Sequence, residues 1–100
     1  MNLQVIASQM KAAFKGKKAV LVRHDAHAVE VYHYQACICK VLPTGEITID
    51  NGGYETKTTK AHINTCLQLL GKRDYIIQKK FEWFFSDGQS FHRHFKMTTY

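Results

Sequence analysis

Threonine and lysine side chains alternate in the segment Thr56-Lys57-Thr58-Thr59-Lys60, directly before a run with helical periodicity. Hydroxyl groups, ammonium groups and the free N–H groups of a first helical turn are all groups that contact phosphate. The same threonines also suit a structural role, because Thr58 or Thr59 would be a good N-cap for the helix. The segment therefore predicts a capped helix first and a phosphate contact second.

Three further cations complete the predicted nucleic-acid contacts: Lys79, Lys80 and Arg93. The chain has a formal net charge of +6 and a pI near 9.3. Such an excess favours polyanions without specifying one, and the basic residues are dispersed, so only folding could gather them on one face. Tyr32 and Tyr34, on the polar face of a predicted strand, could stack on bases, although packing explains them equally well.

The histidines and cysteines raise a metal hypothesis. The pairs are His24 and His27, His92 and His94, and Cys37 and Cys39. Residues i and i+2 share a strand face, so the last two pairs could each face one ion, and zinc takes four N or S ligands. Structural zinc sites usually use C-x2-4-C spacing, however. Free buried thiols and exposed imidazoles are the preferred interpretation, and no metal or cofactor is expected.

Catalysis has little support in the sequence. A metal-independent, histidine-based nuclease would need one imidazole as base, another as acid and a cation on the developing charge. The spacing of the histidines singles out no such set, and the motifs G-x-S-x-G, H-E-x-x-H, P-loop and G-x-G-x-x-G are absent. We therefore expect a protein that is not an enzyme and keep the nuclease as the third hypothesis.

Two segments show the apolar spacing of an amphipathic helix. The first covers residues 2–15, with Asn2 as N-cap and Gly16 at its end, and the second covers about residues 59–70, with Gly71 closing it in a left-handed conformation. Their core-facing stripes are Leu3, Ile6, Met10 and Phe14 in the first and Ile63, Cys66, Leu67 and Leu70 in the second.

The remaining segments show the two-residue period of strands. The run at 19–22 is apolar throughout and predicts a central strand, whereas 28–34 and 36–42 alternate. Turn residues at 43–45 precede a strand at 46–50. Turn residues at 86–89 form a hairpin turn among two or three closing strands. The order predicts an α+β fold with a mainly antiparallel sheet of about five to seven strands in a single domain, residues 1–100.

The expected location is the cytoplasm. No apolar run approaches the ~20 residues of a membrane-spanning helix. The N-terminal segment lacks a basic region ahead of an apolar core, as a targeting peptide would have. Three cysteines, an odd number, indicate free thiols in a reducing compartment.

One stretch resembles a known pattern. Gly52-Gly53-Tyr54, Thr56, Thr58-Thr59-Lys60 and Ile63-Asn64 match G-G-[WY]-x-T-x-T-T-K-x-x-[IM]-N. This pattern is similar to that of small bacteriophage-encoded proteins of unknown function, and the resemblance covers about residues 18–86. It implies an accessory phage protein that acts on nucleic acid or on host machinery.

The sequence thus predicts a non-catalytic binding protein whose basic surface engages nucleic acid, DNA or RNA, or a host nucleoprotein complex. The alternative is a protein-binding inhibitor of a host factor, such as an effector of bacterial anti-phage defence. In both cases the protein would act in the cytoplasm of the host cell, without a membrane partner.

Overall fold

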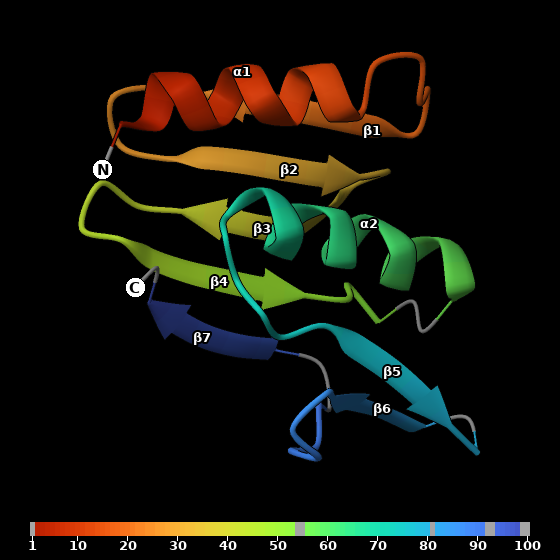
Figure 1. The fold of residues 1–100 in the computed structure, drawn as a ribbon. Coiled ribbons are helices and arrows are strands. Elements are labelled where there is room, and N and C mark those ends of the chain that lie inside the picture. The colour runs from red at the N-terminus through yellow and green to blue at the C-terminus, as the bar shows by residue number, and fades with distance from the viewer. Residues whose placement is uncertain (1, 54–55, 81, 92–93, 99–100) are drawn as a thin grey trace.

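The computed structural model describes residues 2–53, 56–80, 82–91 and 94–98, and the described residues form two helices and seven strands (Figure 1). The helices are α1 (Leu3–Ala13) and α2 (Lys57–Leu69), and the strands are β1 (Val20–His24), β2 (Val29–His33), β3 (Ala36–Val41), β4 (Glu46–Asp50), β5 (Ile76–Lys79), β6 (Glu82–Phe85) and β7 (His94–Thr98). The predicted α+β class is confirmed.

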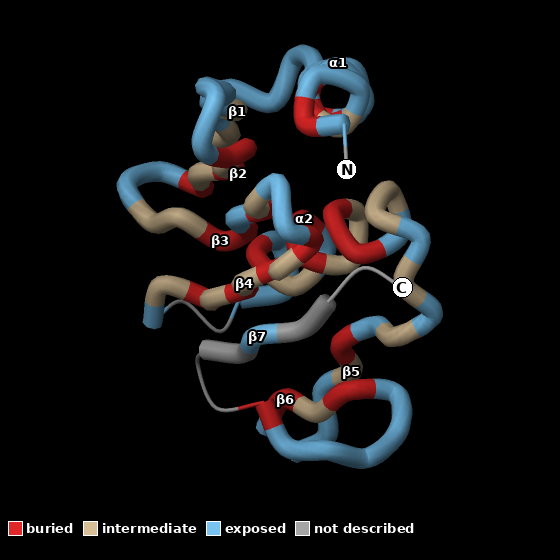
Figure 2. The backbone as a smooth tube through the Cα atoms, turned by 90° about the vertical axis from the view of Figure 1, so that its left-hand side faces the viewer, coloured by how far each residue is buried: buried red, intermediate tan, exposed pale blue. Residues whose placement is uncertain are grey.

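Five strands form an antiparallel sheet in the order β1-β2-β3-β4-β7, and both helices cover the same face of it (Figure 2). Strands β5 and β6 form a separate two-stranded sheet. The prediction of one sheet of about five to seven strands is therefore confirmed only in part. The opposite face of the five-stranded sheet is not covered by either helix, which leaves the fold one helical layer deep.

The prediction of a central strand at residues 19–22 is wrong, because β1 is the edge of the described sheet. Val20 lies opposite His33 and Val22 lies opposite Val31, so both valines face the helices and are half-buried. Leu21 points to the other face and is 58% exposed. A continuous apolar run is typical of strands buried on both faces, and here only one face is covered.

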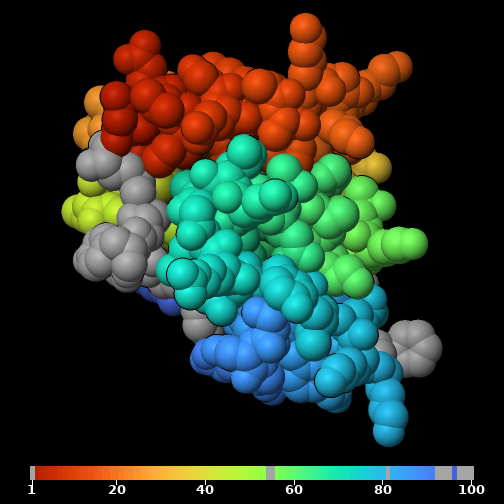
Figure 3. Space-filling model, viewed as in Figure 1, coloured from red at the N-terminus to blue at the C-terminus, as the bar shows by residue number. Residues whose placement is uncertain are grey.

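The hydrophobic core lies between the two helices and the covered face of the sheet. Both predicted helical stripes are confirmed: Leu3, Met10 and Phe14 are buried in or next to α1, Ile63, Cys66 and Leu67 are buried in α2, and Ile6 and Leu70 pack at the margin. Figure 3 shows α2 filling the middle of this side of the molecule, between the N-terminal segments and the β5–β6 hairpin. This position makes α2 the element that joins the two sheets.

A β-bulge in β3 breaks the alternation that the sequence predicts for the cysteines. Cys39 lies opposite Val31 on the core face, whereas Cys37 lies opposite Tyr32 on the uncovered face, with the buried Ile38 as the extra residue. A bulge places two residues opposite one and so reverses the facing of the residues beyond it. The prediction that Cys37 and Cys39 share a face is wrong.

The C-terminus of α2 and the N-terminus of α1 show how local sequence sets the helix bounds. At the C-terminus of α2, Gly71 adopts φ +75, its N–H donates to Gln68 O, and the Lys72 N–H donates to Leu67 O at 3.0 Å. This pair of bonds is a Schellman motif, so the predicted closing role of Gly71 is confirmed. At the other helix, Asn2 caps α1 as predicted, accepting the Val5 N–H through Oδ1 at 3.2 Å.

The β5–β6 hairpin is fastened to α2 by one side chain. Asn64 accepts the Ile76 N–H through Oδ1 at 2.6 Å and donates through Nδ2 to Ile76 O at 3.0 Å. Trp83 and Phe85 are buried on one face of β6, as predicted, and the 86–89 turn is confirmed by a bond from the Phe85 N–H to Gln89 O at 2.8 Å. Phe81, predicted on the same face, lies outside the described residues.

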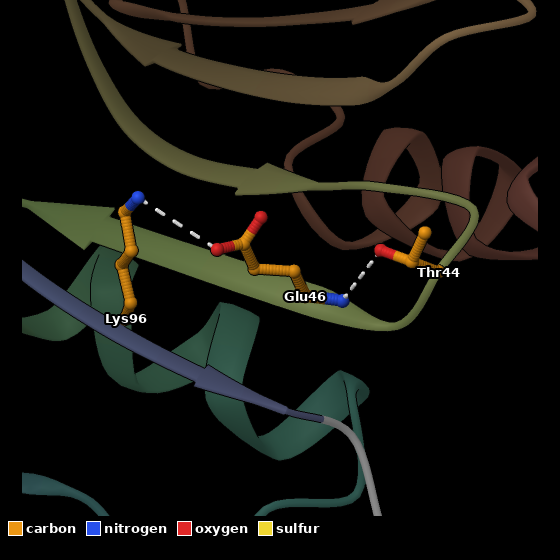
Figure 4. Close-up of polar contacts among 3 residues, drawn as sticks. All are labelled: Thr44, Glu46 and Lys96. Atoms are coloured by element: carbon orange, nitrogen blue, oxygen red, sulfur yellow. Dashed lines mark hydrogen bonds and ion pairs between the residues drawn. The ribbon is translucent and has the colours of Figure 1, made fainter.

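The uncovered face of the sheet is polar. Lys96 of β7 lies 3.7 Å from a carboxylate oxygen of Glu46, whose N–H donates to Thr44 Oγ1 at 3.4 Å (Figure 4). The Lys96 side chain is 64% exposed, so this ion pair contributes little to stability. Neither described helix is long and apolar enough to span a bilayer.

Candidate nucleic-acid interface

The beginning of α2 is built by Thr56. This residue is the N-cap, with extended backbone (φ −92, ψ 157), and its Oγ1 accepts the Thr59 N–H at 3.1 Å. The prediction of Thr58 or Thr59 as the cap is therefore wrong. Since Lys57 and Thr58 occupy the first helical turn, their N–H groups have no acceptor within the helix.

Two glycines bring the chain from β4 into this helix. Gly52 and Gly53 have φ +65 and +86, a region that glycine adopts without steric cost. The Asp50 carboxylate accepts the Gly52 N–H at 2.7 Å, and the Asn51 side chain accepts the Gly53 N–H at 2.8 Å. The double glycine thus forms a turn directly after β4.

A hollow of about 230 Å³ lies in front of the first turn of α2. It is lined by His33, Tyr34, Thr56, Thr58 and Thr59. Thr58 is exposed, whereas Thr59 is fully buried and shares a hydrogen bond of 2.9 Å with the Thr56 hydroxyl. The hydroxyls of Thr56 and Thr59 are therefore bonded to each other, and the hydroxyl of Thr58 is open to solvent.

Two imidazoles lie beneath the hollow. His33 Nδ1 is 3.1 Å from Thr59 Oγ1, and the His33 ring meets the His62 ring edge-on, with centroids 4.9 Å apart. The exposed fractions of the two side chains are only 5% and 9%. Burial lowers the pKa of both imidazoles, and in His62 the neighbouring His33 and Lys17 lower it further. Both rings are therefore neutral at pH 7.

Tyr34 forms the outer wall of the hollow. It occupies the turn between β2 and β3 with φ +56, and its side chain is 69% exposed. Its N–H donates to Ala19 O at 2.7 Å, and its ring lies 4.6 Å from that of His33. The bond to Ala19 ties the segment that carries Lys17 and Lys18 to the rim of the hollow.

The structure brings only some of the predicted contact residues together. Thr56, Lys57, Thr58 and Lys60 come together on the first turn of α2, with Lys57 exposed and Lys60 half-buried. Lys79 and Lys80 are exposed in the turn of the β5–β6 hairpin. Thr59 supports the hollow from below, and Arg93 lies outside the described residues.

The metal hypothesis receives no support from the described residues, among which no three potential ligands cluster. His24 and His27 are exposed, and His92 and the His94 side chain lie outside what the structure describes. Burial raises the pKa of Cys37 to about 11. A hydrogen bond with Cys39, together with burial, raises the pKa of Cys66. Both thiols are therefore protonated at neutral pH.

Sequence reasoning placed neither His33 nor His62 in the candidate binding site. The two are 29 positions apart and meet only in the folded chain, where the beginning of α2 lies next to the end of β2. A signal for His33 was present in its alternation with Val29 and Val31, which placed it on the buried face. For His62 the signal was its position next to Ile63 in the helical stripe.

Comparison with known families identifies the chain. Residues 2–100 match the family described as Kyanoviridae Gp96 protein, and the chain belongs to this family. The predicted relation to small phage proteins is thereby confirmed at the level of the family. No curated protein and no solved structure matches the chain.

Proposed function

We propose that this phage protein binds nucleic acid through the end of the molecule at which α2 begins. The observation that carries the proposal is the gathering of charge at this end. Residues 14–19, 50–60 and 79–82 contain seven lysines and three acids, which supply four of the six net positive charges of the chain. The α1–β1 loop, the beginning of α2 and the β5–β6 turn all lie toward the right-hand side in Figure 1.

Most acidic residues of the chain lie outside these three segments. Asp25 lies in the β1–β2 turn and Glu46 at the beginning of β4, both toward the opposite side in Figure 1. Asp74 and Asp87 lie in the connections before β5 and after β6. The rest of the chain still carries a net charge of +2, but the end at which α2 begins carries +4 in far fewer residues and so attracts a polyanion most strongly.

Backbone polarity acts in the same direction as the lysines. The N-terminus of α2 carries the positive end of the helix dipole, and the N–H groups of Lys57 and Thr58 point outward from its first turn. In Figure 3 the surface of this turn borders the surface of the α1–β1 segment. Phosphates that bridge Lys57 and Lys18 would therefore meet cations and helix N–H groups together.

Salt dependence tests the proposal. If about four phosphates are neutralised, the affinity for a labelled oligonucleotide falls by roughly 50- to 150-fold between ~50 and ~200 mM salt, because neutralised phosphates release counterions. Fluorescence anisotropy measures this directly. Absence of binding at the lower salt would overturn the proposal, and host proteins captured from a nuclease-treated lysate would then favour recognition of a protein.

A matched pair of double variants locates the surface. Lys57→Gln with Lys60→Gln should weaken binding, whereas Lys40→Gln with Lys96→Gln should have a much smaller effect. Both variants remove two charges, but Lys40 and Lys96 lie on the uncovered face of the sheet in line with Thr48. Equal losses in the two variants would show that net charge alone, and not this end of the molecule, governs binding.

A further inference from the structure

We infer that the hollow at the beginning of α2 is a subsite for one unstacked nucleotide, so that the protein prefers single-stranded nucleic acid to a duplex. The inference rests on the proposed function and adds to it the form of the nucleic acid. Three features support the inference: the hollow itself, the exposed ring of Tyr34 and the buried imidazole of His33.

Tyr34 is placed where a base could stack. A side chain of this size that is 69% exposed contributes little to folding, yet its backbone is held in a left-handed conformation and fixed by the bond to Ala19. His33 packs 4.6 Å from the ring, which restricts its movement. Aromatic rings presented in this way stack on unpaired bases of any sequence, and a base within a duplex has no free face to offer.

The first turn of α2 is placed where the phosphate of the same nucleotide could lie. Thr58 contributes an exposed hydroxyl and, with Lys57, N–H groups that have no acceptor among the described residues, next to the lysine side chain itself. The hollow of about 230 Å³ is smaller than the ~300 Å³ of the smallest typical pockets for free ligands. A hollow of this size does not enclose a free ligand and would hold only part of a nucleotide that remains joined to its strand.

His33 supplies a polar group that the fold leaves unused. Only 5% of His33 is exposed, and only Nδ1 has a hydrogen-bond partner among the described residues. Its pKa is lowered by burial, so the ring is neutral and Nε2 can accept or donate according to the tautomer. A neutral group of this kind in the wall of the hollow can bond a sugar hydroxyl or a base edge without repelling the lysines.

The test compares ligands with and without unpaired bases on the full-length chain at ~50 mM salt. Labelled oligo-dT and oligo-U represent single-stranded DNA and RNA, a mixed-sequence duplex of the same length represents paired nucleic acid, and heparin represents a polyanion without bases. Tighter binding of either single strand than of the duplex is expected. Equal affinity for single strands and duplex would overturn the inference and leave the proposed function intact.

Variants of Tyr34 test the stacking contact. Tyr34→Asn removes the ring and keeps a residue that tolerates positive φ, and it should weaken single-strand binding roughly tenfold or more without affecting heparin. Tyr34→Trp should retain binding. The matched control is Tyr75→Asn, which removes another ring that is 53% exposed, near the other end of α2, and should have no effect. Equal effects at Tyr34 and Tyr75 would overturn the inference, and failure of all ligands to bind would overturn the proposed function as well.

Discussion

The two ends of α2 each border a hollow, and the larger of the two is the poorer candidate for a binding site. The hollow at the C-terminus, about 270 Å³, is lined by Asn64, Gln68, Lys72, Arg73, Asp74 and Tyr75. Its best-placed amide, that of Asn64, is already occupied by both backbone groups of Ile76. At the smaller hollow, of about 230 Å³, the first-turn N–H groups are free of helix partners.

In the proposed function, backbone polarity and hydrogen-bond status favour the smaller hollow more than volume favours the larger one. The C-terminus of a helix carries the negative end of the dipole, which opposes an anion even beside Lys72 and Arg73. At the N-terminus the dipole, the hydroxyl of Thr58 and the lysines act together. The C-terminal hollow is therefore interpreted as a structural joint and the N-terminal hollow as a place for a ligand.

The largest expected effect comes from breaking the structural joint. Asn64→Ala leaves the N–H and C=O of the buried Ile76 without their partners, so the free energy of unfolding should fall by about 2–4 kcal/mol. Chemical denaturation measures the loss. The control is Gln68→Ala, which changes an exposed residue of the same hollow and should alter stability by less than about 0.5 kcal/mol.

The nucleic-acid affinity of the same Asn64→Ala variant tests whether the two ends of α2 have different roles. Folded Asn64→Ala protein should bind oligonucleotides as the unmodified chain does, because the joint lies at the opposite end of α2 from the proposed interface. Loss of binding by folded variant, with stability unchanged, would reverse the roles that we assign to the two ends.

A smaller effect is expected from removing the cap at the other end. Thr56→Ala deletes the acceptor of the Thr59 N–H and should lower the free energy of unfolding by about 1 kcal/mol. Thr56→Ser keeps the hydroxyl and should retain most of the stability. Thermal unfolding of the two variants beside Thr58→Ala, which changes an exposed first-turn threonine, provides the measurement. A cap at Thr58 would be indicated if Thr58→Ala proved the more damaging change.

The smallest effect near neutral pH concerns the buried imidazoles. Burial holds the pKa values of His33 and His62 below the ordinary value of 6.5, so the unfolded chain takes up protons that the folded chain does not. These two imidazoles contribute no change in stability above pH 7, and stability should decline as the pH falls below 6.5. His62→Phe should flatten this decline, whereas His24→Ala, at an exposed position, should leave it unchanged. A decline that is the same in both variants would contradict the account.

Much of the fold was predictable because its signals are local. The stripe of Ile63, Cys66 and Leu67 indicated α2, and Gly71 indicated its end, since helix periodicity and a left-handed cap depend on neighbouring residues only. The bulge that separates Cys37 from Cys39 has no such signal. It arises where β2 and β3 pair, and nothing in the run Ala36–Val41 marks the extra residue.

The candidate site was predictable only along its own segment. The sequence indicated Lys57, Lys60 and the threonines, but three threonines within four residues are nearly equivalent as caps. Thr59 is buried beside His33, and that contact across 26 positions leaves Thr56 as the cap. Because Tyr34 joins the hollow through the β2–β3 turn, its place beside the helix could come only from the assembled sheet.

The most direct test is a map of backbone amide shifts by NMR during titration with a single-stranded oligonucleotide at ~50 mM salt. The account predicts the largest shifts at Tyr34, Lys57 and Thr58, with the segment from Gln68 to Tyr75 unchanged. Shifts concentrated in that second segment, or no shifts at all, would contradict the claim that the N-terminal end of α2 meets the nucleic acid.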